Sequence, residues 1–143
     1  MKLKVYIMHS EKIDYINEIY KPLLKLGLMN DYYLILPMSN KYGSSYIKEL
    51  LNDSDIVICD LTNSNIFLKA ELKMAIKQEK EIYYFIKEGS KEINKYKDIK
   101  LNIYKDKNEL SNSVKNLLDS LNHKELLLKR ENIFCLGKIQ NNV

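Results

Sequence analysis

Apolar residues in this chain follow two patterns: short uninterrupted runs, and longer stretches in which they recur every three or four positions. The clearest run is Ile56 to Cys59, which is bounded by Asp55 and Asp60. A short, largely β-branched run closed by polar residues is typical of a strand buried on both faces, as in a parallel sheet covered by helices. The sequence therefore predicts that residues 56–59 form a central strand.

Four more segments have the length and composition of strands, and helical periodicity fills much of the chain between them. The predicted strands are residues 3–8, 32–36, 56–59, 81–87 and 99–104, with the last at an edge of the sheet. The predicted helices are residues 12–26, 45–52, 66–80 and 108–121. Pro22 predicts a kink or break near Tyr20, and Gly27 is expected to end the first helix. Residues 39–45 form a polar turn, and the apolar segment 124–139 packs on the sheet or forms a partner contact.

Strands and helices alternate along the chain and are joined by short connections. This order predicts an α/β fold, a doubly wound three-layer sandwich with a five-stranded parallel sheet in order 2-1-3-4-5, the flavodoxin-like topology. At 143 residues the chain is expected to form one domain. We expect residues 1–122 to form the α/β unit and residues 123–143 to be a C-terminal helical extension of the same domain.

Composition and charge exclude several classes of protein. The chain is 45% apolar and 29% charged, as in ordinary globular proteins. No run approaches the ~20 apolar residues of a membrane span, and the N-terminus has no secretory pattern, so a cytoplasmic location without a membrane partner is expected. The net charge of +4 comes from lysines interleaved with acids, which argues against a nucleic-acid partner. Two separated cysteines and two histidines predict no metal site, and no cofactor is expected.

One carboxylate, Glu71, lies inside the apolar helix predicted at 66–80. The residues three and four positions away from it on the helix are all apolar: Phe67, Leu68, Met74 and Ala75. The helix thus presents Glu71 from an apolar surface near the carboxyl end of the central strand, where ligands bind in open α/β sheets. The alternative is a glutamate at the rim of the buried face with its carboxylate in water.

The predicted topology brings the ends of the first and third strands to one crevice, which the first turns of helix 66–80 overlook. The polar residues expected there are His9, Ser10, Glu11, Asp60, Thr62 and Asn63, with Glu71 above them. His9 either binds ligand or has a structural role. Asp60 is either catalytic or caps the turn after the strand.

Several separated motifs in residues 2–88 occur in a familiar order. They are Val5-Tyr6-Ile7-Met8-His9-Ser10, Tyr20-Lys21-Pro22-Leu23, Leu34-Ile35-Leu36-Pro37 and Glu71-Leu72-Lys73-Met74-Ala75. In them the chain resembles the nucleoside 2-deoxyribosyltransferase superfamily, especially its deoxynucleoside 5′-monophosphate N-glycosidases. The resemblance implies that Glu71 attacks the anomeric carbon of a (deoxy)ribose and that Tyr6 orients either Glu71 or the sugar. It also implies that Ser10 binds a sugar hydroxyl or phosphate, and that the chain forms a homo-oligomer.

The sequence differs from that family at positions that the family uses for substrate binding and catalysis. The family's turn Ser-x-Gly-x-Gly-x-Glu reads here Asn65-Ile66-Phe67-Leu68-Lys69-Ala70-Glu71, so both glycines are missing and Asn65 replaces the serine. The family's proton donor, an aspartate before the third strand, has no counterpart between Gly43 and Ile47. His9 and Asp60 are the candidates to replace that acid.

The chain also resembles TIR domains, which share this order of elements and place a glutamate in a W-C-x-x-E-L helix. Lys69-Ala70-Glu71-Leu72 is similar to that motif. Both resemblances imply that Glu71 acts in the cleavage of an N-glycosidic bond, of a deoxynucleotide in one case and of NAD in the other. The sequence therefore favours an N-glycosidic-bond enzyme acting on a nucleoside or nucleotide. A catalytically impaired nucleotide sensor and a TIR-like NADase or signalling domain stay open as alternatives.

Overall fold

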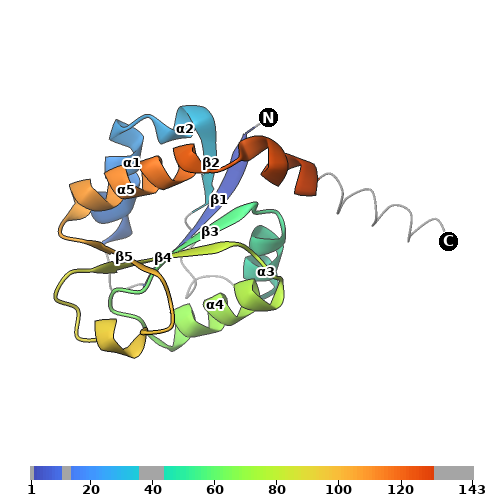
Figure 1. The fold of residues 1–143 in the computed structure, drawn as a ribbon. Coiled ribbons are helices and arrows are strands. Elements are labelled where there is room, and N and C mark those ends of the chain that lie inside the picture. Colours follow the sequence, from blue (N-terminus) through green and yellow to red (C-terminus); the bar gives the residue numbers. More distant parts are fainter. Residues whose placement is uncertain (1, 11–13, 36–43, 131–143) are drawn as a thin grey trace.

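A computed structural model describes residues 2–10, 14–35 and 44–130, which form a sheet between two layers of helices (Figure 1). The five strands are β1 (Leu3–Met8), β2 (Tyr32–Ile35), β3 (Ile56–Asp60), β4 (Ile82–Lys87) and β5 (Leu101–Tyr104). They are parallel and lie in the order β2-β1-β3-β4-β5. The predicted fold class and strand order are confirmed.

Helices cover both faces of the sheet (Figure 1). The upper face in that view, called here the α5 face, carries η1 (Ile16–Tyr20), α1 (Lys21–Lys25), α2 (Leu28–Asp31) and α5 (Lys107–Ser120). The other face, called here the α4 face, carries α3 (Ser44–Asn52) and α4 (Ile66–Lys77). A short helix, η2 (Ile93–Lys95), precedes β5.

The central strand β3 is buried along its whole length, as its apolar sequence predicts. It pairs with β1 on one side and β4 on the other, with Val5 opposite Ile56 and Val57 opposite Ile82. Successive side chains of a strand point to opposite faces of the sheet. Ile56 and Ile58 therefore belong to the core under α5, whereas Val57 and Cys59 belong to the core under α4.

Local capping determines where α4 begins and ends. The Asn65 side chain accepts a hydrogen bond from the Leu68 backbone N–H at 2.9 Å, as an N-cap does. The helix ends at Lys77, three residues before the predicted end, because Glu79 adopts a left-handed conformation with φ 58°. The N–H groups of Glu79 and Lys80 then donate to the carbonyls of Ile76 and Ala75, which is a Schellman motif.

The kink or break predicted near Tyr20 in the helix 12–26 appears as a change from a π-helical to an α-helical segment. The π-helical segment η1 ends at Tyr20, and α1 follows with Pro22 in its first turn, where a missing N–H costs no hydrogen bond. Gly27 ends α1 with φ 72°, and the short helix α2 that follows was not predicted. Residues 11–13 and 36–43, which hold Glu11, the end of the second predicted strand and most of the predicted 39–45 turn, lie outside the described residues.

A final helix over residues 123–130 is attached to the amino end of the sheet. Arg130 Nε donates to Asp55 Oδ1 at 2.8 Å, and its Nη2 donates to Asp55 Oδ2 and to the Lys2 carbonyl. The same carboxylate accepts from the Lys4 backbone N–H at 2.8 Å. Leu126 and Leu127 pack against the core of the α5 face. This part of the apolar segment therefore packs on the same chain, while residues 131–139 of it lie outside the described residues.

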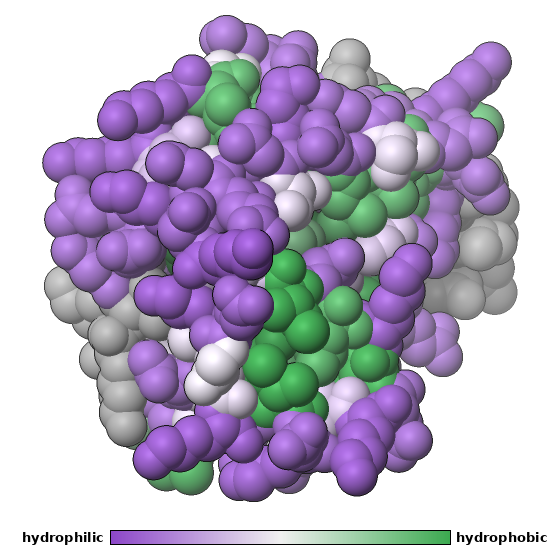
Figure 2. Space-filling view, turned by 60° about the vertical axis from the view of Figure 1, so that its left-hand side comes forward, coloured by the Kyte–Doolittle hydropathy of each residue, from purple (hydrophilic) through white to green (hydrophobic). Residues whose placement is uncertain are grey.

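Strand β5 forms one edge of the sheet, and its Ile103 is 50% exposed. On the side of the molecule that includes this edge, apolar side chains gather in patches bordered by hydrophilic ones (Figure 2). Among residues 2–10, 14–35 and 44–130, no helix has the length and apolar character that crossing a membrane requires.

The contact between Arg130 and Asp55 gives a testable measure of how strongly the C-terminal helix supports the sheet. Arg130→Met keeps most of the apolar stem and removes the guanidinium, which leaves the buried Asp55 carboxylate with the Lys4 N–H alone. We expect the free energy of unfolding, measured with urea, to fall by about 2–3 kcal/mol. Lys129→Met, at the exposed neighbouring position, is the matched control and should change it by less than about 0.5 kcal/mol. Equal effects of the two substitutions would contradict the prediction.

Candidate functional site

Five buried polar residues gather around the carboxyl ends of β1 and β3. They are His9, Ser10, Asp60, Thr62 and Glu71. Burial of a polar group costs free energy unless the group is hydrogen-bonded, so each of these side chains is expected to have a hydrogen-bond partner. The partners divide the cluster into two groups, one on each face of the sheet.

On the α4 face, Tyr6 and Glu71 form a buried pair. Tyr6 is 0% exposed and Glu71 2% exposed, and the Tyr6 hydroxyl donates to Glu71 Oε2 at 2.8 Å. The second carboxylate oxygen, Oε1, is buried and has no hydrogen-bond partner among residues 2–10, 14–35 and 44–130. Tyr6 lies in an apolar core that includes Leu68 and Ala75 of α4. Among the described residues, Glu71 is therefore held at one oxygen in apolar surroundings, and its other oxygen is buried without a donor.

Burial determines the electrostatics of this pair. Desolvation raises the pKa of Glu71 to about 7, and the hydrogen bond from Tyr6 lowers it only in part. Burial and the adjacent carboxylate raise the pKa of Tyr6 well above its ordinary value. The phenol therefore stays protonated and acts as the donor, and Glu71 exchanges its proton near neutral pH.

On the α5 face, Asp60 is the centre of a second network. Its Oδ1 accepts from the Thr62 backbone N–H at 3.0 Å and its Oδ2 accepts from the Tyr104 hydroxyl at 2.7 Å. Thr62 Oγ1 lies 3.1 Å from the Tyr104 hydroxyl and accepts from the Lys87 backbone N–H at 2.9 Å. These bonds join the carboxyl ends of β3, β4 and β5. Burial raises the pKa of Asp60, and the bonds from Tyr104 and Thr62 oppose that effect.

His9 and Ser10 follow β1 and are both buried. His9 Nδ1 lies 3.0 Å from the Ser10 carbonyl, and since a carbonyl only accepts, this nitrogen carries the proton. The ring stacks on Tyr15 with centroids 5.2 Å apart, and its Nε2 is buried without a partner. Burial lowers the pKa of His9, although the Ser10 carbonyl and Asp60 oppose this. The stacking favours a structural role for the ring.

The expectation that Glu71 overlooks the same crevice as Asp60 is corrected by the structure. Tyr6, which binds Glu71, belongs to the core of the α4 face, whereas Tyr104, which binds Asp60, belongs to the core of the α5 face. The cause is the two-residue alternation of β1 and β3, which sends the side chains to opposite faces of the sheet. The catalytic and binding roles of these residues remain predictions, and the residues lie in two separate places, one on each face of the sheet.

The remaining predicted residues lie around these two groups. Asn63 is exposed in a left-handed conformation with φ 54°, which asparagine tolerates better than most residues. Asn65 caps α4 instead of lining a glycine-rich turn. Phe67, in the position of one missing glycine, is 47% exposed in the first turn of α4. Among the described residues, no group of three or more His, Cys, Asp or Glu side chains is arranged to hold a metal ion.

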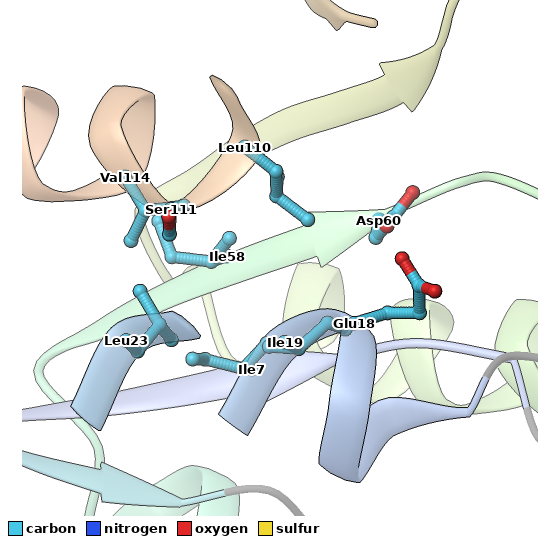
Figure 3. Close-up of a pocket in the computed structure, with 9 residues that line it drawn as sticks. All are labelled: Ile7, Glu18, Ile19, Leu23, Ile58, Asp60, Leu110, Ser111 and Val114. Carbon is cyan, nitrogen blue, oxygen red and sulfur yellow. The ribbon is translucent and has the colours of Figure 1, made fainter. Parts of the chain in front are cut away.

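A cavity of about 230 Å³ opens on the α5 face beside Asp60. It is lined by Asp14, Glu18, Ile19, Asp60, Thr62, Asn63, Lys87, Tyr104, Lys107 and Leu110. Next to it lies a narrow apolar cleft of about 10 Å³ between the sheet, α1 and α5 (Figure 3). At one end of this cleft the Glu18 carboxyl points toward Asp60 (Figure 3).

Four lining residues were not predicted as site residues from the sequence: Glu18, Lys87, Tyr104 and Lys107. A signal was present for two of them. Lys87 and Tyr104 end β4 and β5, and the carboxyl ends of parallel strands are where ligand sites form. Glu18 and Lys107 lie on amphipathic segments, and their meeting across a cavity depends on packing that the sequence pattern does not show.

Glu71→Gln should stabilise the fold in a pH-dependent way. The Glu71 carboxyl has a pKa near 4.5 in the unfolded chain and about 7 in the folded one. Between these pH values the folded state binds more protons than the unfolded state. The free energy of unfolding of the wild type therefore falls by about 3 kcal/mol as pH rises from 4.5 to 7. Glutamine does not titrate. The stability of the variant relative to wild type should therefore be higher at pH 8 than at pH 4.5 by about that amount. Urea denaturation at both pH values measures it.

The exposed Glu49 supplies the control for that experiment, because Glu49→Gln makes the same change of charge on the surface of α3. Its stability relative to wild type should vary little with pH. If Glu71→Gln behaves like Glu49→Gln, the Glu71 carboxylate is solvated and the buried pair does not exist in solution.

Comparison of the sequence with protein-family models and with curated proteins finds no match. Comparison of the structure with solved structures finds similarity to the TIR domains in the structure of the activated Roq1 resistosome that directly recognises the pathogen effector XopQ. The TM-score is 0.50 at 13% sequence identity, and the alignment covers 91% of this chain and 80% of that chain. The similarity supports a TIR-like α/β fold, the second of the two resemblances, and none of the comparisons supports the deoxyribosyltransferase superfamily.

Proposed function

We propose that this chain is a TIR-like domain that hydrolyses the N-glycosidic bond between nicotinamide and ribose in NAD, with Glu71 as the catalytic carboxylate. The observation that carries the proposal is the Tyr6–Glu71 pair. One oxygen of a buried carboxylate is fixed at 2.8 Å by a phenol, and the other has no partner in the part of the chain that the structure describes. The TIR-like fold supports NAD over a deoxynucleotide as the substrate.

The chemistry requires a carboxylate that faces the anomeric carbon. As the bond from C1′ to the nicotinamide nitrogen breaks, its electron pair goes to the ring and C1′ becomes an oxocarbenium-like centre. The free oxygen of Glu71 stabilises this positive charge or bonds to C1′. Water then adds to C1′ and releases a proton, which gives ADP-ribose and neutral nicotinamide. The apolar surroundings strengthen the attraction between the carboxylate and the developing charge.

The absence of a family-type proton donor also favours NAD. A purine or pyrimidine leaves a nucleotide as an anion unless an acid protonates it. The nicotinamide ring of NAD is already a cation, and it leaves as a neutral molecule without protonation. The sequence between Gly43 and Ile47 lacks the acid of the deoxyribosyltransferases. Asp60, a candidate to replace that acid, lies on the opposite face of the sheet from Glu71.

Turnover is expected to depend on the Glu71 carboxylate. Purified protein incubated with NAD should release nicotinamide, measured by chromatography, and Glu71→Gln should lower kcat/KM by a thousandfold or more, on the order of 4 kcal/mol or more in the barrier. Since the ionised carboxylate is the active form, kcat/KM should rise with pH through an apparent pKa of about 7. A Gln variant that keeps a tenth of the wild-type rate would refute the assignment of Glu71.

Tyr6→Phe separates a positioning role from simple packing in the same assay. Loss of the hydroxyl removes the hydrogen bond that lowers the pKa of Glu71, so the rising limb of the pH profile should move to higher pH. Tyr32→Phe is the matched control, because Tyr32 is another buried tyrosine bonded to a carboxylate, Asp119, far from Glu71 along the chain. The control should leave the pH profile unchanged. Binding of NAD without release of nicotinamide would select the nucleotide-sensor alternative.

We also propose that the chain self-associates, as the sequence analysis expects. The similarity to TIR domains of an assembled resistosome supports this, and the first turn of α4 offers apolar surface, with Ile66 74% and Phe67 47% exposed. Multi-angle light scattering should return a mass above the 16.9 kDa of one chain, rising with concentration if association is weak. A constant mass near 16.9 kDa at the highest attainable concentration would contradict the proposal.

A further inference from the structure

The cavity on the α5 face has a rigid, buried floor. Asp60, Thr62 and Tyr104 line it, and their exposed fractions are 2%, 8% and 6%. The hydrogen bonds among them fix the Asp60 carboxylate, which accepts from the Tyr104 hydroxyl and from the backbone and side chain of Thr62. A carboxylate can accept about four such bonds. The floor therefore retains acceptor capacity beside the open volume.

The two sides of the cavity carry opposite charge. Asp14 and Glu18 line it from the segment that follows β1, and the Glu18 carboxyl points toward Asp60 (Figure 3). Two lysines line the cavity on the other side of β3, where β4 and β5 lie. They are Lys87, at the end of β4, and Lys107, at the start of α5. Within the described part of the chain, neither lysine forms an ion pair, and neither does Glu18. The charges of the two sides are thus not neutralised by each other.

From this arrangement we propose that the cavity binds a small zwitterion, a molecule with a cationic nitrogen at one end and a carboxylate or phosphate at the other. The cationic nitrogen lies between Glu18 and Asp60, where two neighbouring carboxylates repel each other unless a cation separates them. The anionic group lies against Lys87 and Lys107. Ile19 and Leu110 complete the apolar part of the lining. A ligand with only one charge leaves one side of the cavity without a partner.

The volume limits the size of the ligand. About 230 Å³ lies below the roughly 300–1,000 Å³ of pockets that enclose drug-sized ligands, so the cavity fits a molecule of amino-acid size and is too small to enclose a dinucleotide. The cavity also lies on the opposite face of the sheet from Glu71. The proposed ligand is therefore distinct from the substrate proposed above, and this inference does not depend on that activity.

Isothermal titration calorimetry with a defined set of probes tests the proposal. The zwitterions are glycine, alanine, glutamine and phosphoethanolamine, and the singly charged analogues are acetate, phosphate and ethanolamine. At least one zwitterion should bind with Kd below about 1 mM and at least tenfold more tightly than each of its singly charged analogues. Amino acids and phosphoethanolamine in separate titrations distinguish a carboxylate from a phosphate as the anionic group. Added salt should weaken binding, since the ligand is held by partly exposed charges.

Substitutions locate the binding site. Glu18→Gln and Lys107→Gln should each weaken zwitterion binding at least fivefold. Glu109→Gln and Lys105→Gln are the matched controls, because both residues are exposed near Lys107 and neither lines the cavity. Glu71→Gln should leave binding unchanged, so this result is independent of whether the protein cleaves NAD.

Three outcomes would overturn the proposal. One is that no zwitterion in the set binds with a Kd below about 1 mM. Another is that acetate, phosphate or ethanolamine binds as tightly as the zwitterions, which would assign the cavity to a single charge. The third is that the control substitutions weaken binding as much as Glu18→Gln and Lys107→Gln, since the ligand would then lie elsewhere. Circular dichroism of each variant establishes that the fold is retained before its binding is compared.

Discussion

The alternation of side chains along β1 and β3 is the constraint on which the rest of this structure depends. A parallel strand with helices on both sides must bury both sets of its side chains, and β3 does so from Ile56 to Asp60. The same alternation that builds the two cores also separates the polar residues at the strand ends. Tyr6 points to the α4 face with Val57 and Cys59, whereas Asp60 follows Ile56 and Ile58 to the α5 face. Two chemically different sites therefore arise from adjacent strands.

Both sites keep a carboxylate out of water, but they compensate for its burial differently. Each oxygen of Asp60 has a hydrogen-bond donor, and the network connects the carboxyl ends of three strands. Glu71 has one donor for two oxygens. An unpartnered buried acceptor lowers stability, and residues that do so often have a functional role that outweighs the cost. This difference, more than the burial itself, distinguishes Glu71 as the candidate for catalysis.

The sequence predicted the architecture well because each strand signal was local. The uninterrupted run at 56–59 and the kink or break predicted near Tyr20 both act within a few residues. The first appears as β3, and the second as the change from the π-helical segment η1 to the α-helix α1. The helix end at Lys77 was missed because a left-handed glutamate, Glu79, closes the helix where glycine is the usual signal. The site was harder to predict. Glu71 was identified from its apolar neighbours in the sequence. Its separation from Asp60 depends on which face of the sheet the Asp60 side chain points to and on which face α4 covers.

Cys59 lies on β3, the strand whose two faces border the two sites. It is buried next to Asp60 in sequence and faces the same core as Tyr6. Burial raises the pKa of its thiol well above the ordinary value, and the negative charges of Asp60 and Glu71 raise it further. A thiol in this position stays protonated and unreactive, and it adds no charge between the two carboxylates. An anionic residue there would be repelled by both carboxylates, so a small side chain that stays neutral suits the strand that separates the two sites.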